Sequence, residues 1–208
     1  MAGALDDLHG RRAAGLPASP RWAAPRFGSF ALSDDRPPGA AILANWSRLR
    51  RFPGGERIFS RVIGLQTPYS GSIGAIVREL EPGRAVVSLR DRRSVRNHLE
   101  SIHAVALTNL GELASGLALV TDLPAGTRAI VTELQIEFLK KARGRLVAVG
   151  SASAPPRDDL DHGPVACVAR AEIRDMEGEV VAILRADWQV GLREPAPANP
   201  LPEKGEPG

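Results

Sequence analysis

Apolar residues recur along the chain with periods that predict its secondary structure. From residue 40 to residue 51 they follow the spacing of a short amphipathic helix, and Pro53 ends that pattern. A second apolar-periodic run, residues 58–65, ends near Pro68, and its spacing favours another helix. Two helices are therefore predicted ahead of the main body of the domain.

The pattern changes to that of strands after these helices. Two runs rich in Val, Ile and Leu, residues 73–80 and 84–90, meet at the turn sequence Glu81-Pro82-Gly83 and predict a hairpin. A long apolar helix is predicted over residues 103–121. Four further alternating or β-branched runs cover residues 127–138, 144–154, 165–175 and 179–190. The order of two strands, one helix and four strands predicts an α+β fold, in which one antiparallel sheet wraps around a central helix.

The long helix carries a single internal carboxylate. At about 100° per residue its apolar side chains form one stripe that would face the sheet, made of Leu107, Leu110, Ala114 and Leu117. Glu112 lies on the opposite side, where helix geometry alone allows a solvated carboxylate. Its neighbours there include Val105 and Gly116, which are poor choices for a water-facing surface. This face is therefore predicted to meet another element or another subunit, and a carboxylate buried there could act as a nucleophile or general base.

Composition sets the expected domain organisation. The 208 residues suffice for one ordinary hydrophobic core. Residues 1–38 and 193–208 are rich in proline and show no sustained period, which predicts a flexible N-terminal arm and a flexible C-terminal tail. Residues 39–192 are predicted to form the folded domain with its helical extension.

Charge and cysteine usage narrow the class of protein. The chain has 27 basic and 24 acidic residues, a mixed balance that does not by itself call for nucleic acid. The lone Cys167 lies in an apolar run, so we expect it to be buried, and a reducing compartment fits best. No uninterrupted apolar run approaches the roughly 20 residues of a membrane span, and we expect a cytoplasmic protein. The acidic run at residues 158–162 lacks a calcium-loop pattern and is expected to be a solvated loop; neither a metal nor a cofactor is expected.

One segment has the character of a functional site. It runs Asn97-His98-Leu99-Glu100-Ser101-Ile102-His103-Ala104-Val105-Ala106, and Glu112 follows it. Its amide, imidazole and carboxylate span a loop-to-helix junction, where backbone N–H groups are free to bind an oxyanion. This combination suggests hydrolysis of an activated acyl group.

With Val95 and Arg96 before it, the segment resembles the signature of hotdog-fold acyl-CoA thioesterases, in particular the PaaI-like branch. In such enzymes an Asn or Gln precedes a loop, a His follows six residues later, and a Glu or Asp lies nine residues beyond the His. Asn97, His103 and Glu112 match both spacings. The resemblance covers roughly residues 68–190, including the order of the strands.

The resemblance implies a mechanism and an assembly. Glu112 would attack the thioester carbonyl of an acyl-CoA or activate a water, and the backbone N–H of Ala104 would bind the oxyanion. His103 would help to place the thioester, and Asn97 would position the carbonyl or the attacking water. The active site would lie at the interface of a homodimer or homotetramer. Ala104 and Val105 replace two glycines that many relatives carry, which leaves less room for a ligand near the backbone.

Basic residues are candidates for binding the phosphates of coenzyme A. Lys141, Arg143 and Arg145 form a basic turn between strands, and Arg96 belongs to a second basic run. Both groups could equally be solvated surface. Two other functions stay open. One is a hotdog protein that binds acyl-CoA or lipid without turnover or acts as a dehydratase. The other is an interaction or nucleic-acid module that uses the arginine-rich arm and the basic patch at residues 90–96.

Overall fold

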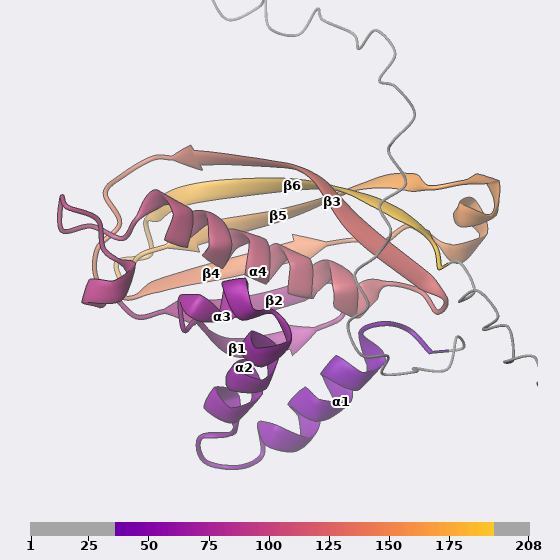
Figure 1. Cartoon of the computed structure of the whole chain (residues 1–208), viewed down its shortest axis with the longest axis horizontal. Helices are drawn as coiled ribbons and strands as arrows, with labels where there is room; N and C mark the ends of the chain where they lie inside the picture. The colour runs from indigo at the N-terminus through magenta and orange to yellow at the C-terminus, as the bar shows by residue number, and fades with distance from the viewer. Residues whose placement is uncertain (1–35, 194–208) are drawn as a thin grey trace, which may run out of the picture. The chain divides into compact units, whose positions relative to one another are not determined.

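The computed structural model describes residues 36–193 of the chain. One six-stranded antiparallel sheet has the order β1-β2-β4-β5-β6-β3. Its strands are β1 (Ile76–Glu81), β2 (Arg84–Leu89), β3 (Thr127–Phe138), β4 (Leu146–Ala152), β5 (Val165–Arg174) and β6 (Val180–Leu192). The helix α4 (Ala104–Asp122) packs across the middle of this sheet (Figure 1). The predicted α+β hotdog architecture is confirmed.

Close approach of α4 to the sheet explains its central place. The predicted apolar stripe of α4 is buried against the strands. Two glycines allow the contact: a Cβ on Gly111 would lie 2.9 Å from Cβ of Leu184, and a Cβ on Gly150 would lie 2.2 Å from the carbonyl oxygen of Ala114. Within the described residues α4 is the one helix long and apolar enough to cross a membrane, but 61% of that stretch is buried inside the domain.

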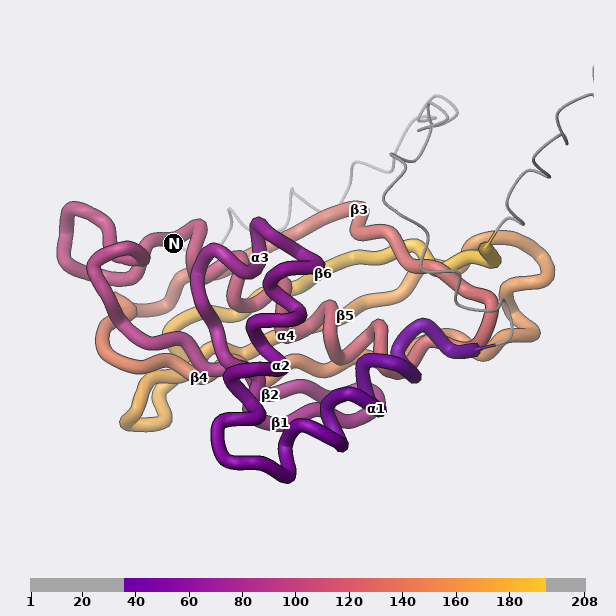
Figure 2. The backbone as a smooth tube through the Cα atoms, turned by 60° about the horizontal axis from the view of Figure 1, so that its bottom comes forward, coloured from indigo at the N-terminus to yellow at the C-terminus, as the bar shows by residue number. Residues whose placement is uncertain are grey.

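Three helices precede the sheet: α1 (Ala40–Leu49), α2 (Gly55–Gln66) and α3 (Pro68–Ser72). Helices α1 and α2 pack against the edge strand β1, while α3 packs on α2 and α4 (Figure 2). The hydroxyl of Ser60 on α2 accepts a hydrogen bond from the backbone N–H of Val77 at 2.9 Å, which caps a donor on the edge strand. The two helices predicted over residues 40–51 and 58–65 correspond to α1 and α2 and are confirmed. The helix α3 was not expected, and because it is followed by Gly74 at φ 59°, β1 begins at residue 76 rather than 73.

Three further expectations concern the acidic run, the lone cysteine and the two ends of the chain. The acidic side chains of residues 158–162 are exposed, as expected for a solvated segment. The segment is not an irregular loop, however, but the short 3-10 helix η2 (Arg157–His162), and it buries Leu160 in the core. A second 3-10 turn, η1 (Arg93–Val95), follows β2. Cys167 is buried as expected. The arm and the tail lie almost entirely outside residues 36–193.

Candidate active site

The loop at residues 97–101 is folded around the side chain of Asn97. Its Oδ1 accepts hydrogen bonds from the backbone N–H of Leu99 at 2.9 Å and from both the backbone N–H and the hydroxyl of Ser101 at 3.2 Å. Glu100 adopts a left-handed φ of 55° within this loop. The amide oxygen therefore holds the loop together, whereas no acceptor among residues 36–193 engages the amide nitrogen.

His103 is the N-cap of α4. Its Nδ1 accepts a hydrogen bond from the backbone N–H of Val105 at 3.1 Å. A neutral imidazole that accepts at Nδ1 carries its proton on Nε2, and the exposed ring presents that N–H outward. The backbone N–H of Ala104 has no acceptor in the described part of the chain, as expected for the first turn of a helix. Two donors thus lie together at the start of α4.

Glu112 lies in the middle of α4, on the face turned away from the apolar stripe. Its side chain is half-buried, and burial raises the pKa of its carboxyl above the ordinary value. Within residues 36–193 no side chain or backbone N–H donates to this carboxyl. A Cβ on Gly116 would lie 3.6 Å from Oε1 of Glu112 and 3.6 Å from the Trp188 ring, so the absent side chain leaves space beside both groups.

Trp188 is a neighbour that the sequence analysis missed. It lies on β6, its indole Nε1 is buried, and that nitrogen has no hydrogen-bond partner in the described residues. The alternation of Ala186, Trp188 and Val190 along the strand could have placed the indole on the inner face of the sheet. The alternation gives no information about which residue of α4 it meets.

A single copy of the chain does not bring the three predicted catalytic side chains together. Glu112 comes nine residues after His103, which is about 13 Å along the helix axis. The Asn97 loop is tied to the same end of α4 as His103, because a bridge joins Arg96 to Ile102 and the N–H of His103 donates to the carbonyl of Val95. One chain therefore places the predicted donors at the start of α4 and the predicted carboxyl at its middle, and we refer to these two groups as the half-sites.

The basic turn at residues 140–145 lies beside the Asn97 loop. The carbonyl of Ala142 accepts a hydrogen bond from the backbone N–H of Ile102 at 2.8 Å, and a guanidinium nitrogen of Arg143 lies 3.5 Å from the carbonyl of Leu99. Lys141 is exposed on the same turn. Lys141 and Arg143, two of the predicted phosphate-binding residues, therefore lie near the Asn97 loop.

Arg96 and Arg145, the other two predicted phosphate-binding residues, have different surroundings. Arg96 is paired with Asp91 at 2.6 Å, and this hydrogen bond is the main reason why the pKa of the Asp91 carboxyl lies below its ordinary value. Arg96 is thus already engaged by an acid. Arg145 precedes β4 and lines a separate cavity with Arg78 of β1 and Arg90, which follows β2.

Comparisons with solved structures agree with this architecture. A protein solved as a genomics target is 28% identical, with 74% of this chain and 99% of that chain covered at a TM-score of 0.63. A probable thioesterase from Pseudomonas aeruginosa is 24% identical, with coverages of 68% and 97% and a TM-score of 0.57. A thioesterase family protein from Silicibacter pomeroyi is 22% identical, with coverages of 64% and 96% and a TM-score of 0.53. These likenesses show the shared hotdog fold.

Sequence comparison gives the family. No curated protein matches the chain. The family model described as domain of unknown function DUF4442 matches residues 55–190, which is more than half of the chain and runs from α2 into β6. The chain belongs to the DUF4442 family.

Proposed function

We propose that this protein is a thioesterase that hydrolyses acyl-CoA thioesters, with Glu112 as its nucleophile or general base. The observation that carries the proposal is the state of Glu112: a half-buried carboxyl with a raised pKa and no hydrogen-bond donor from the described residues. A structural carboxylate would be paired or solvated, whereas a catalytic base is tuned towards the working pH. The probable thioesterase from P. aeruginosa and the thioesterase family protein from S. pomeroyi, which have the same fold, support the reaction class.

Either role of Glu112 gives a balanced reaction. As a general base, Glu112 takes a proton from water while the water oxygen bonds to the thioester carbon. The carbonyl oxygen becomes an oxyanion that accepts a hydrogen bond from the backbone N–H of Ala104. Collapse of this intermediate breaks the C–S bond, and the thiolate takes the proton held by Glu112. As a nucleophile, Glu112 displaces the thiolate to form an anhydride, which water then cleaves to the acid and free Glu112.

A second copy of the chain completes this site. The strand β3 is at one end of the sheet order, and along it Ile130, Leu134 and Phe138 are exposed apolar side chains. An unpaired apolar edge strand favours pairing with another chain. Because β3 pairs with β6, which carries Trp188, a partner at this edge would approach the face of α4 that carries Glu112. In the homodimer that we propose, Asn97 and His103 of one subunit face Glu112 of the other.

Glu112→Gln tests the function most directly. The variant keeps the shape of the side chain but has neither a base nor a nucleophile. Thiol release from acyl-CoAs of several chain lengths should therefore stop. The circular dichroism spectrum and the molar mass should stay those of the wild type. Single turnover in ¹⁸O-water then tests the nucleophilic role, because water that attacks the Glu112 carbonyl of the anhydride leaves its label in Glu112, whereas a general base never acquires the label. A folded, fully active Glu112→Gln protein would overturn the proposal.

Two substitutions separate positioning from folding at the other half-site. Asn97→Asp keeps the oxygen that closes the loop but removes the amide donor, and His103→Asn keeps an N-cap acceptor but removes the imidazole N–H. Both variants should retain the wild-type melting temperature and lose activity. Unchanged kcat/KM in both would leave the half-site without a role in the reaction.

The start of α4 also favours a second candidate function, acyl-CoA binding without turnover. The N–H of Val105 is engaged by His103, so it cannot serve as a second oxyanion donor in this conformation. This function predicts saturable binding of acyl-CoA by the wild type with no thiol released.

A further inference from the structure

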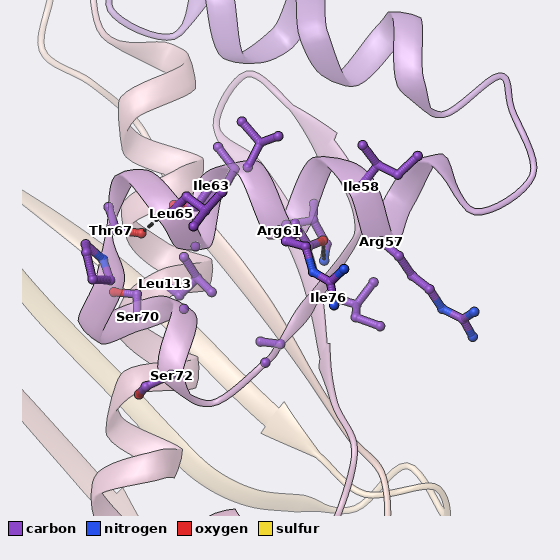
Figure 3. A pocket seen from close by; sticks show the side chains of 18 of the residues that line it. Arg57, Ile58, Arg61, Ile63, Leu65, Thr67, Ser70, Ser72, Ile76 and Leu113 are labelled. Carbon is purple, nitrogen blue, oxygen red and sulfur yellow. Dashed lines mark hydrogen bonds between the residues drawn. The ribbon is translucent and has the colours of Figure 1, made fainter.

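A cavity of about 900 Å³ lies where α2 and α3 meet the β1 edge. Figure 3 shows Leu65, Thr67 and Leu113 at one end of it, and Arg57 and Arg61 near Ile76 at the other. Leu65 of α2 and Leu113 of α4 supply apolar surface at the first end, whereas Ile58 and Ile76 lie beside the arginines. Val62 is a further aliphatic residue of the lining, and Ile58, Val62 and Leu65 are exposed on α2.

A second cavity, of about 580 Å³, adjoins the first. The two share part of their lining, including Arg57, Arg61 and Arg92, so they form one groove with an apolar end and a basic end. The basic end is bounded by guanidinium groups from α2 and from β1, β2 and β4 or the residues next to them. These are Arg57, Arg61, Arg78, Arg90, Arg92 and Arg145.

The positive charge of this groove is largely unbalanced within the described residues. Arg78 alone has an acidic partner, Glu56 on α2 at 2.5 Å, and it also donates to the hydroxyl of the buried Ser88 at 2.8 Å. Arg92 lies 3.4 Å from a backbone carbonyl, that of Ser72. No carboxylate of residues 36–193 pairs with the other arginines of the groove. Clustered like charges repel one another unless an anion joins them.

We propose that this groove binds an amphiphilic phosphate, a molecule with a phosphate head and an unbranched apolar tail. Guanidinium groups hydrogen-bond phosphate oxygens in pairs, which suits the head to the basic end. Burial of the tail at the apolar end removes its apolar surface from water. A polyanion such as nucleic acid has no apolar tail and would gain nothing from that end. The groove lies on the β1 side of α4, whereas Glu112 faces Trp188 of β6, so the inference does not rest on the proposed thioesterase activity.

Calorimetry with dodecyl phosphate below its micelle concentration tests the proposal on the full-length protein. Inorganic phosphate supplies the head alone and dodecyl maltoside supplies the tail without the charge. Both should bind at least roughly tenfold more weakly than dodecyl phosphate, because each contacts only one end of the groove. Glu112→Gln should bind dodecyl phosphate as the wild type does.

A charge-matched pair of variants locates the site. Arg57→Gln/Arg61→Gln removes two exposed arginines of the groove, and Arg128→Gln/Arg170→Gln removes two exposed arginines of β3 and β5. The first pair should weaken binding of dodecyl phosphate roughly tenfold or more, and the second should leave it unchanged. Equal melting temperatures of the two variants exclude a folding defect. Equal losses in both variants would overturn the proposal, as would inorganic phosphate binding as tightly as dodecyl phosphate.

Vesicles distinguish the source of the ligand. Phosphatidylcholine vesicles with about a fifth of phosphatidic acid present the same head in a bilayer. Binding of both monomeric dodecyl phosphate and these vesicles, each lost in Arg57→Gln/Arg61→Gln, supports the groove and indicates a lipid source. Binding of the monomer alone supports it and indicates a soluble ligand. Binding of vesicles alone would overturn the proposal, because a membrane surface does not need the cavity.

Discussion

Gly116→Ala is expected to stabilise the fold and weaken catalysis at the same time. Gly116 lies inside α4, and alanine is more favourable than glycine in a helix by about 1 kcal/mol. The new Cβ would make ordinary contacts, 3.6 Å from Oε1 of Glu112 and 3.6 Å from the Trp188 ring. The variant should therefore gain about 1 kcal/mol in free energy of unfolding, or roughly 3 °C in melting temperature. The same methyl group fills the space beside Glu112, so kcat/KM should fall.

Two other glycines serve as controls for the steric part of this argument. A Cβ on Gly111 would press against Leu184 at 2.9 Å, so the helix gain of about 1 kcal/mol is offset by overpacking of similar or larger size. A Cβ on Gly150 would lie 2.2 Å from the carbonyl oxygen of Ala114, a backbone atom that cannot move aside cheaply. Gly150→Ala should lose roughly 3 kcal/mol or more.

Urea unfolding at one fixed protein concentration, read by circular dichroism, ranks the three variants, and thiol release measures catalysis. A fixed concentration is needed because association shifts apparent stability. The expected order of stability is Gly116→Ala, wild type, Gly111→Ala, Gly150→Ala. A destabilised Gly116→Ala would refute the inference of open space beside Glu112, and a stable Gly116→Ala with full activity would refute its placement in the site.

Three further outcomes are expected. In the proposed mechanism Glu112 acts deprotonated, and burial raises its pKa, so the kcat/KM of the wild type should fall on acidification at a higher pH than an ordinary glutamate would give. Linkage fixes the sign for stability: the Glu112 contribution is present at low pH and lost as pH rises through the folded pKa. Glu112→Gln should lack this contribution when urea unfolding of both proteins is compared over a pH series. Ser60→Ala leaves the edge N–H of Val77 without its acceptor and should cost about 1 kcal/mol in urea unfolding, whereas a neutral result would mean that water replaces the hydroxyl. Leu134→Lys places a charge on the exposed β3 edge and should reduce the mass from twice 22.1 kDa to 22.1 kDa in light scattering; an unchanged mass would move the interface away from β3.

Strong local periodicity made most of the fold predictable from the sequence. The strand over residues 127–138 and the helix that begins at the His103 cap were predicted almost to the residue, because alternation and an N-cap are local signals. The helix α3 was missed because five residues cannot show a helical period. Leu160 was missed because a single apolar residue in an acidic run carries no period, although the fold buries it.

The candidate site was only partly predictable, for a different reason. The spacing of Asn97, His103 and Glu112 is visible in the sequence, but the loop-closing role of the Asn97 oxygen depends on φ values and hydrogen bonds that spacing does not encode. The neighbourhood of Trp188 and Glu112 depends on how β6 passes α4, a contact between residues far apart in the chain. The arginine groove likewise draws on separate elements, so no single run of the sequence indicated it.

The N-terminal helices decide which edge of the sheet is left for a partner. The sheet ends in β1 and β3. Ser60 and the rest of α2 cover the β1 edge, so among the described elements β3 is the edge that keeps unpaired backbone groups beside exposed apolar side chains. The β3 edge is also the one whose neighbour β6 carries Trp188 against the Glu112 face of α4. In the dimer that we propose, the covered β1 edge therefore leaves β3, on the side of the domain that carries the proposed catalytic carboxyl, as the edge that pairs with the second copy.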